Sequence, residues 1–259
     1  SAAEEARAPH RLFGHVDGAE RYSVGGWARD AAAALSAIAA RGRAAIVAGG
    51  TGLYFRALTE GLSQAPDVPP PVREEAEARL AAIGLSAFRD EVIAADPAMA
   101  RLKPGDRQRH IRAWEVHRAT GRPLSAFQTG GAPLIAEPAA RIVLDPPRAA
   151  LYAAIEARFD AMLAAGALAE AQALADRGLS PALPVMKAVG VPELLDHLAG
   201  RLSLDEAIDR AKQSSRRFAK RQMTWFRNQT PDWPRASSPA EALATLAAQL
   251  RGARRSAQE

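Results

Sequence analysis

Apolar residues recur with the spacing of an α-helix over most of this chain, and the first such segment begins at Ser23. Ser23 is a typical helix N-cap, and Gly42 is a typical terminator. The apolar stripe between them consists of Trp27, Ala31, Leu35 and Ile38. Residues 43–50, RAAIVAGG, form a short apolar run that predicts a strand, and the helical pattern returns after Thr51. Strand, glycine turn and helix start together predict one unit of an α/β fold.

A proline-rich stretch, residues 63–71, cannot continue a helix or a central strand and therefore separates this unit from the next part of the chain. From residue 72 to residue 128 the pattern predicts several helices, and residues 141–145, RIVLD, return as a strand. We therefore expect an α/β core with a helical insertion. The predicted parts are residues 1–62 for the first part of the core, 63–140 for the insertion and 141–259 for the second part of the core.

Helical patterns continue in the second part of the core. One predicted helix ends at Gly166, another covers residues 167–178, and residues 179–194 are rich in turn formers. Ser203 and Glu206 match a capping box, which predicts the start of a long helix. The sequence TPDWP, beginning at Thr230, ends that helix because proline cannot continue it.

The composition is that of an ordinary globular protein, with 48% hydrophobic and 24% charged residues. No run of about 18 apolar residues occurs, so we expect no membrane-spanning helix and predict a cytoplasmic protein. The chain has no cysteine, which excludes disulfides, thiolate metal sites and thiol nucleophiles. The histidines show no metal-ligand spacing, so no protein metal site is predicted from them. They are His10, His15, His110, His117 and His197.

Positive charge is concentrated in one part of the chain, although the net charge is only +5. Residues 210–227 carry seven cations and no carboxylate. A solvated helix face normally mixes both signs, so this run predicts contact with RNA phosphates. The expected basic face consists of Lys212, Arg216, Lys220 and Arg227, and the opposite face consists of Ile208, Ala211, Ser215, Phe218 and Trp225. Trp225 and Phe226 could stack on bases or pack in the core.

Two further positions are candidate ligand sites, each with a structural alternative. Thr51 follows two glycines at a predicted helix start, where free backbone amides can bind phosphate, although a tight turn also explains the glycines. Arg158 lies on the apolar stripe formed by Leu151, Ile155 and Met162. A guanidinium buried there needs a partner, which is either a carboxylate or a bound anion.

Residues 106–112, DRQRHIR, predict a helix start with Asp106 as the N-cap. Gln108 and Arg112 then lie one turn apart on a polar face, opposite the apolar residues of the same helix. Both residue types contact bases or phosphates in nucleic-acid complexes. Pairing with Glu115 on a solvated face is an equal alternative.

Five motifs in order resemble the tRNA dimethylallyltransferase family, also called tRNA isopentenyltransferases. The motifs are VAGGTGLYFRALTEGL, DRQRHIRAWEVHRATGRPLS, LYAAIEARFDAMLAAG, KAVGVPELLDHLAG and SRRFAKRQMTWFR. They span nearly the whole chain, and APHRLFGHVD near the start is also similar to the family. The resemblance implies a phosphate-loop NTPase-like parallel sheet with a helical insertion that contacts tRNA.

The implied reaction moves the dimethylallyl group of dimethylallyl diphosphate to the exocyclic amine of the adenosine 3′ of the anticodon. The amine must lose a proton, the departing diphosphate must be stabilised, and water must be kept from an allylic cation-like transition state. The resemblance implies Mg²⁺ as cofactor. It also implies the tRNA anticodon stem-loop and dimethylallyl diphosphate as partners, and a monomer.

The resemblance also assigns roles to residues. Thr51 and Arg158 are the implied catalytic residues, with Thr51 beside the tRNA and the reaction channel and Arg158 on the diphosphate. The implied tRNA contacts of the insertion are Arg73, Gln108, Arg109, His110, Ile111 and Arg112. Those of the second part of the core are Lys187, Ala188, Val189, Gly190, Val191, Pro192, Arg216, Lys220, Arg221, Gln222, Trp225 and Arg227. Val191 stands where the family usually has tyrosine, so this contact departs from the family pattern.

The family begins with a strand, a GPTASGK[ST]-like phosphate loop and a second strand that bears the general-base aspartate. Nothing from Ser1 onward matches these features, and the pattern GxxxxGK[ST] occurs nowhere in the 259 residues. We therefore expect a truncated chain whose N-terminal core strands, phosphate loop and general base would lie before Ser1.

Two other functions fit parts of the same pattern. A phosphate-loop kinase of a nucleotide or small metabolite also combines strand, glycine turn and helix with a helical lid. Such a kinase does not need seven cations on one late helix. A non-enzymatic RNA-binding protein fits the residues as they stand.

These 259 residues are expected to show no prenyl transfer, because the phosphate loop and the general base are missing from them. The measurement is turnover of dimethylallyl diphosphate in the presence of tRNA. Modified tRNA above the level of a reaction without protein would contradict this expectation.

Overall fold

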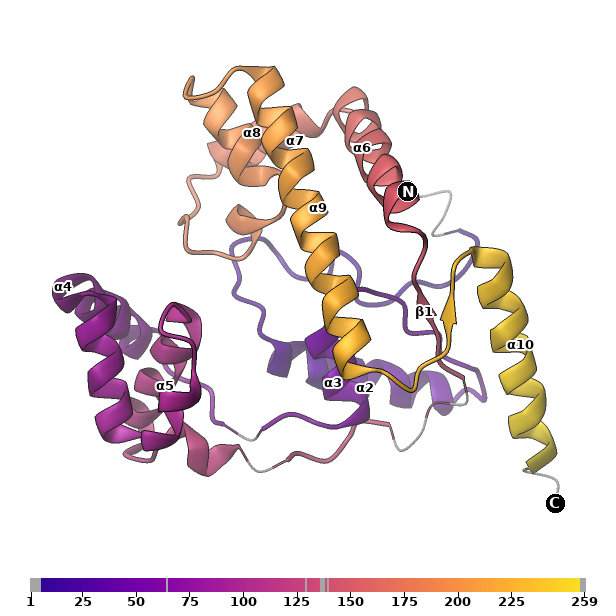
Figure 1. Cartoon of the computed structure of the whole chain (residues 1–259), viewed down its shortest axis with the longest axis horizontal. Coiled ribbons are helices and arrows are strands. Elements are labelled where there is room, and N and C mark those ends of the chain that lie inside the picture. Colours follow the sequence, from indigo (N-terminus) through magenta and orange to yellow (C-terminus); the bar gives the residue numbers. More distant parts are fainter. Residues whose placement is uncertain (1–5, 64, 129, 136–137, 139, 257–259) are drawn as a thin grey trace. The chain divides into compact units, whose positions relative to one another are not determined.

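The described part of the chain is mainly helical, with a small parallel sheet in an α/β arrangement (Figure 1). The computed structural model describes residues 6–63, 65–128, 130–135, 138 and 140–256. The chain forms two compact units, of which unit 1 contains Ser1–Phe55 and Ile135–Glu259 and unit 2 contains Arg56–Leu134. The insertion expected from the sequence begins and ends slightly later than unit 2.

Unit 2 is built on two helices, α4 (Pro70–Ala95) and α5 (Arg107–Thr120). The short 3₁₀ helices η1 (Pro97–Arg101) and η2 (Leu124–Phe127) follow them. The helices predicted for this block are confirmed. Gly84 interrupts α4 with a φ of 76°, so the helix is kinked there. The core of the unit consists of Ala76, Leu80, Phe88, Val92, Met99, Ile111, Ala113, Val116 and Leu124.

Two aspartates fix the ends of these helices. Asp106 caps α5 as predicted, because its side chain accepts a hydrogen bond from the Arg109 N–H at 3.2 Å. Gly121 ends α5 with a φ of 69°. Asp96 is buried and accepts hydrogen bonds from the backbone N–H and the hydroxyl of Ser125 at 2.9 and 2.8 Å. Since a buried carboxylate needs such donors, Asp96 holds η2 against the end of α4.

Unit 1 begins with α2 (Val24–Ala39), whose predicted cap Ser23 accepts a hydrogen bond from the Gly26 N–H at 3.0 Å. Helix α3 (Gly52–Thr59) starts after Thr51 and runs from unit 1 into unit 2. The later helices are α6 (Arg148–Ala164), α7 (Ala167–Asp176), η3 (Val185–Lys187), α8 (Val191–Leu198), α9 (Leu204–Gln229) and α10 (Pro239–Ser256).

The sheet consists of two short parallel strands, β1 (Val143–Leu144) and β2 (Arg235–Ala236). Val143 lies opposite Arg235, and Leu144 lies opposite Ala236. Strand β1 lies inside the strand predicted for residues 141–145, which is therefore confirmed in position but is shorter. The sequence does not predict β2, because two residues are too few to show an alternating pattern.

The strand predicted for residues 43–50 is wrong, since no strand forms there. A strand needs a neighbour for its backbone hydrogen bonds, and within the described ranges this segment pairs with none.

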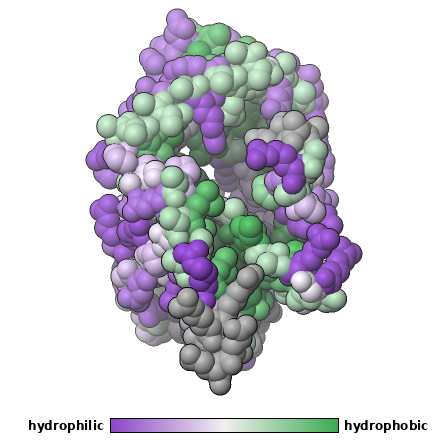
Figure 2. Space-filling model, turned by 90° about the vertical axis from the view of Figure 1, so that its right-hand side faces the viewer, coloured by the Kyte–Doolittle hydropathy of each residue, from purple (hydrophilic) through white to green (hydrophobic). Residues whose placement is uncertain are grey.

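Ile46 in this segment is 93% exposed, and Leu144 of β1 is 52% exposed. Figure 2, which views the molecule from the side of α10, shows hydrophobic surface among hydrophilic residues. Part of the apolar surface of unit 1 is therefore uncovered.

Helix α10 is a second element that the sequence pattern does not predict. Its start carries a capping signal, because the Glu241 N–H donates to the Ser238 hydroxyl at 3.3 Å and the Glu241 carboxylate accepts from the Ser237 N–H at 2.8 Å. At the other end, Gln249 bonds both the N–H and the carbonyl of Arg141, at 2.9 and 3.0 Å. Helix α10 thus supports the chain just before β1.

Helix α9 organises the second part of unit 1, because it packs against both α6 and α8. Its predicted capping box is confirmed: Ser203 accepts from the Glu206 N–H at 3.2 Å, and Glu206 accepts from the Ser203 N–H at 2.9 Å. The hydrogen bonds from Ser203 lower the pKa of Glu206. The helix ends at Thr230 as predicted. Its buried positions are Ala207, Ala211 and Ala219, and these small side chains allow the neighbouring helices to approach closely.

Contact with α9 also explains Gly50 and Gly52, because a Cβ on Gly50 would lie 2.2 Å from the Gln222 side chain. The Gln222 side-chain N–H donates to the Gly50 carbonyl at 2.9 Å. A Cβ on Gly52 would lie 2.2 Å from the Trp225 ring. Neither Gly50 nor Gly52 has a positive φ, so the close approach of α9, and not a turn conformation, requires glycine at these positions.

Gly52→Ala should destabilise the protein by about 1–3 kcal/mol, because the added methyl group overlaps the Trp225 ring. Gly49→Ala is the matched control, since nothing lies within 4 Å of a Cβ at that position. The control should be neutral or stabilise by up to about 1 kcal/mol. Urea unfolding followed by tryptophan fluorescence measures both variants, and equal midpoints would contradict the contact.

Candidate nucleic-acid interface and ligand pocket

Acidic residues of α6 pair with two of the seven cations of residues 210–227. Lys212 Nζ lies 2.6 Å from Asp160 Oδ1, and Arg216 forms an ion pair with Glu156. The Lys212 side chain is only 18% exposed. The expectation that all cations of residues 210–227 lie unopposed is wrong for these two. The neutralising acids belong to α6, which is far from α9 in the sequence, so the residues around Lys212 and Arg216 do not predict these ion pairs.

Four other cations of α9 are exposed on one side of the helix, and we call them the free basic face. They are Arg217, Lys220, Arg221 and Arg227. None of these four forms an ion pair with any residue that the structure describes. The Arg221 guanidinium lies 5.5 Å from the centre of the Phe218 ring, which holds it against the helix. The free basic face can therefore meet phosphates without first breaking a salt bridge.

The aromatic residues at the end of α9 pack within unit 1. The Phe226 ring lies 5.7 Å from Phe55, which in turn lies 5.8 Å from Trp233. Trp225 contacts Phe226 edge to face at 5.0 Å and lies against Gly52. Of the two alternatives for these rings, packing is the one that the structure contains. They position the helix that carries the cations.

A cavity of about 280 Å³ lies in unit 1 between α6, α9 and the loop before α8. Its lining includes the apolar residues Leu151, Ile155, Phe159 and Phe218, together with the polar residues Arg158, Ser215 and Gln222. Through its hydrogen bond to the Gly50 carbonyl, Gln222 connects this cavity with the segment that carries Thr51. Thr51 itself is exposed at the start of α3.

Arg158 is exposed, so the expectation that it is buried in the apolar stripe is wrong. The reason is that α6 is only partly covered by its neighbours, and Met162 on the same stripe is also 43% exposed. No carboxylate in the described part of the chain pairs with Arg158. An unpaired guanidinium beside an apolar cavity suits a ligand that joins an anionic group to an apolar one.

The loop of residues 187–192 borders the same cavity. Gly190 has a φ of 96°, and a Cβ on it would lie 3.2 Å from the Phe159 ring. Glycine therefore lets the loop approach α6, and it places Val189 in the lining of the cavity. Lys187 is exposed at the end of η3, and Val191 is the first residue of α8.

In unit 2, the five residues 108–112 do not share one surface. Gln108 and Arg109 are exposed and Arg112 is half-buried, whereas His110 and Ile111 are 0% and 3% exposed. An α-helix turns about 100° per residue, so five consecutive side chains cannot all face a ligand. On α5, Gln108, Arg109 and Arg112 therefore remain candidate RNA contacts, whereas His110 and Ile111 are buried.

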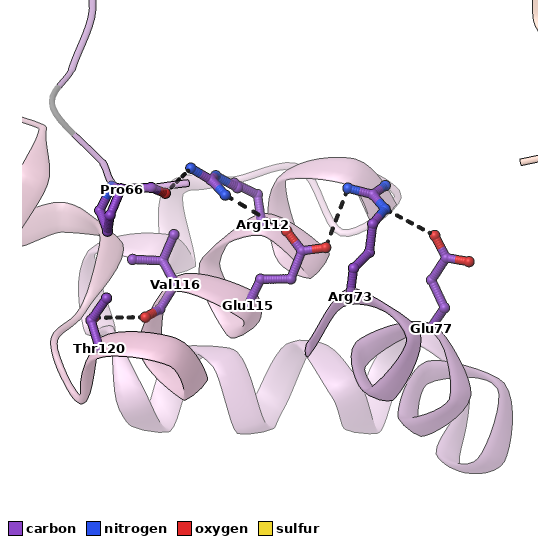
Figure 3. Close-up of polar contacts among 7 residues, drawn as sticks. All are labelled: Pro66, Arg73, Glu77, Arg112, Glu115, Val116 and Thr120. Atoms are coloured by element: carbon purple, nitrogen blue, oxygen red, sulfur yellow. Dashed lines mark hydrogen bonds and ion pairs between the residues drawn. The ribbon is translucent and has the colours of Figure 1, made fainter. Parts of the chain in front are cut away.

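Arg73 and Arg112 meet at one acidic side chain in unit 2 (Figure 3). Arg73 Nη1 lies 3.2 Å from Glu115 Oε1, and Arg73 Nε donates to Glu77 at 3.2 Å. Arg112 donates to the Pro66 carbonyl at 2.8 Å and lies 3.9 Å from the other Glu115 oxygen. The intrahelical pair that was an alternative to RNA contact is thus present. Sequence reasoning names Glu115 only as that partner and gives no sign that it also contacts α4.

Across the described ranges, no group of three or more His, Asp or Glu residues could hold a metal ion. Nor is any described helix long and apolar enough to cross a membrane. The candidate sites therefore consist of cations, amides and apolar walls.

Comparisons with known proteins agree on one family. The family model for IPP transferase matches residues 1–229. A tRNA dimethylallyltransferase of Phenylobacterium zucineum is 54% identical over 236 residues, which are 91% of this chain and 76% of that protein. One of Nitrobacter hamburgensis is 52% identical over 254 residues, covering 97% of this chain and 80% of the relative.

A solved structure gives the same result. The full-length tRNA isopentenylpyrophosphate transferase of Bacillus halodurans superposes with a TM-score of 0.66 at 31% identity. The match covers 100% of this chain and 84% of that chain. The resemblance carried by the five sequence motifs is confirmed, and this chain belongs to the IPP transferase family.

Proposed function

We propose that this protein acts in tRNA modification, the transfer of the dimethylallyl group of dimethylallyl diphosphate to the exocyclic amine of the adenosine 3′ of the anticodon. Residues 1–259 contain no phosphate loop and by themselves are expected to bind the substrates without turnover. The observation that carries the proposal is the pairing, within unit 1, of the free basic face with the cavity beside Arg158. The free basic face suits an RNA backbone, and the cavity suits a diphosphate that carries an apolar group. The names of relatives that match more than nine-tenths of the chain support the same activity.

In the proposed reaction the bond between the allylic carbon and the diphosphate oxygen breaks, and a bond from the adenosine amine to that carbon forms. The amine loses one proton to the general-base aspartate that the family resemblance implies, which is not among residues 1–259, and diphosphate leaves with the electron pair of the broken bond. Arg158 stabilises the charge on the leaving group, and the apolar walls, such as Leu151 and Phe218, hold the hydrocarbon and exclude water. Thr51 lies at the start of α3, next to the segment held by Gln222, and we assign it to the reaction channel.

The parallel pair of β1 and β2 supports our proposal of a phosphate-loop NTPase-like core. Magnesium would neutralise the diphosphate oxygens of such a substrate. Within the described residues, no group of three or more His, Asp or Glu side chains could hold that ion. A tRNA substrate also implies action in the cytoplasm.

The proposed tRNA contacts are the free basic face, the loop of residues 187–192 and the exposed arginines of unit 2. The pattern GxxxxGK[ST] belongs both to phosphate-loop kinases and to the transferase family, so its absence from residues 1–259 does not separate the two functions. A kinase, however, would not need a basic helix face free of salt bridges. The transferase therefore accounts for more of the structure than the kinase does.

The double variant Lys220→Gln with Arg221→Gln should weaken binding of a tRNA anticodon stem-loop and flatten its salt dependence. Each lost phosphate contact should reduce the slope of log K against log salt by about one unit. Lys212→Gln with Arg216→Gln is the matched control, because it removes the same charge from the same helix at positions already paired with α6. Filter binding at several salt concentrations measures both. Equal slope changes, or binding that ignores salt, would contradict the assigned interface.

Arg158→Gln should weaken binding of dimethylallyl diphosphate by about 10- to 100-fold, as expected for losing charge-assisted hydrogen bonds. Arg148→Gln is the control on the same helix, because the Arg148 guanidinium lies 5.0 Å from the centre of the Tyr152 ring and does not line the cavity. Isothermal titration calorimetry measures both variants and the unaltered chain. Absence of diphosphate binding by the unaltered chain, or equal effects of the two substitutions, would refute the role of Arg158.

A further inference from the structure

Glu115 is a buried carboxylate that contacts arginines from two helices. Its side chain is 2% exposed, whereas the side chains of Arg73 and Arg112 are 34% and 37% exposed. One Glu115 oxygen lies 3.2 Å from Arg73 Nη1, and the other lies 3.9 Å from Arg112 Nη1 (Figure 3). The acid is inside, and the two cations it contacts reach toward solvent.

The contacts of the two arginines leave part of each guanidinium available. A guanidinium has five N–H donors in a rigid fork. Arg73 donates a hydrogen bond through Nε to Glu77, and Arg112 donates one through Nη2 to the Pro66 carbonyl. The Nη1 atoms of both arginines lie at ion-pair distances from Glu115. Donors therefore remain on two partly exposed cations that share one carboxylate.

A buried carboxylate is a costly way to stabilise a small helical unit, because an apolar residue of similar size often serves as well. Its effect on the arginines is more specific. Long side chains lose much rotamer freedom when they bind a phosphate, and a side chain that is already held in place loses less. The Glu115 charge attracts one end of each fork. The Pro66 carbonyl then joins the segment before α4 to the same cluster.

We propose that Glu115 is a positioning residue, which holds Arg73 and Arg112 in the orientation that binds phosphates of the tRNA. The proposal rests on the tRNA-binding function proposed above and adds to it a residue that does not touch the RNA. Glu115 lies behind the two arginines and acts through them.

Glu77 provides a built-in comparison. It is also an acid within reach of Arg73, but its side chain is 37% exposed and lies one turn along the same helix. An exposed pair of this kind is weak and is easily exchanged for another anion. Glu77 therefore competes with phosphate for Arg73, while Glu115 supports the binding.

The test compares Glu115→Gln with Glu77→Gln, two substitutions that each remove one negative charge. General attraction to a polyanion would tighten tRNA binding equally in both. Our proposal instead expects the dissociation constant for the tRNA anticodon stem-loop to rise about tenfold in E115Q. It expects the constant to stay the same or to fall in E77Q. Unchanged or tighter binding by E115Q would overturn the proposal.

A second arm separates positioning from a merely structural role. When Arg73 and Arg112 are both replaced by glutamine, adding E115Q should change the dissociation constant by less than about twofold, because the groups through which Glu115 acts are gone. A further loss of about tenfold in that background would show that Glu115 acts through the fold and would overturn the proposal.

A third arm remains informative even if E115Q fails to fold. Arg73→Lys with Arg112→Lys keeps both charges but removes the forks that Glu115 orients. Binding should weaken about tenfold, and unchanged binding would overturn the proposal. Failure of the unaltered chain to bind tRNA would overturn the proposed function together with this inference. Normal binding combined with an unaffected E115Q would overturn this inference alone.

Discussion

The packing of α9 against α6 is the interaction on which the candidate surfaces of unit 1 depend. Buried alanines of α9 let its neighbouring helices approach, and the acids of α6 neutralise Lys212 and Arg216. Like charges on one helix repel each other, so this pairing lowers the cost of gathering seven cations in residues 210–227. The same packing encloses the cavity beside Arg158 and leaves the free basic face toward solvent.

Acids determine which cations are available in both units. In unit 1, the acids of α6 occupy the cations nearest the helix contact and leave the others free. In unit 2, one buried acid holds two arginines in place while their remaining donors stay accessible. A count of positive charge would treat all these arginines and lysines alike. Their partners and burial separate residues that support the fold from residues that can bind a polyanion.

The sequence predicts the parts of this structure that depend on local patterns. These features depend on residues within a few positions of each other. They are the helix capped by Ser23, the Asp106 cap, and the long basic helix α9 with its capping box. The strand expected at residues 43–50 fails because pairing depends on a distant neighbour. Sequence patterns also do not predict three other features for the same reason. These are the ion pairs of Lys212 and Arg216, the exposure of Arg158 and the burial of His110. Each depends on how separate helices meet.

The central claim is that α9 presents one free and one occupied set of cations, and lysine footprinting tests it directly. Limited acetylation followed by mass spectrometry, with and without a tRNA anticodon stem-loop, compares Lys220 with Lys212 on the same helix. Lys220 is exposed, and Lys212 is 18% exposed and paired with Asp160. We expect Lys220 to react freely and to be protected by the RNA, while Lys212 reacts poorly in both states. Free reaction of Lys212 that the RNA suppresses, or a Lys220 that the RNA leaves unprotected, would contradict the account.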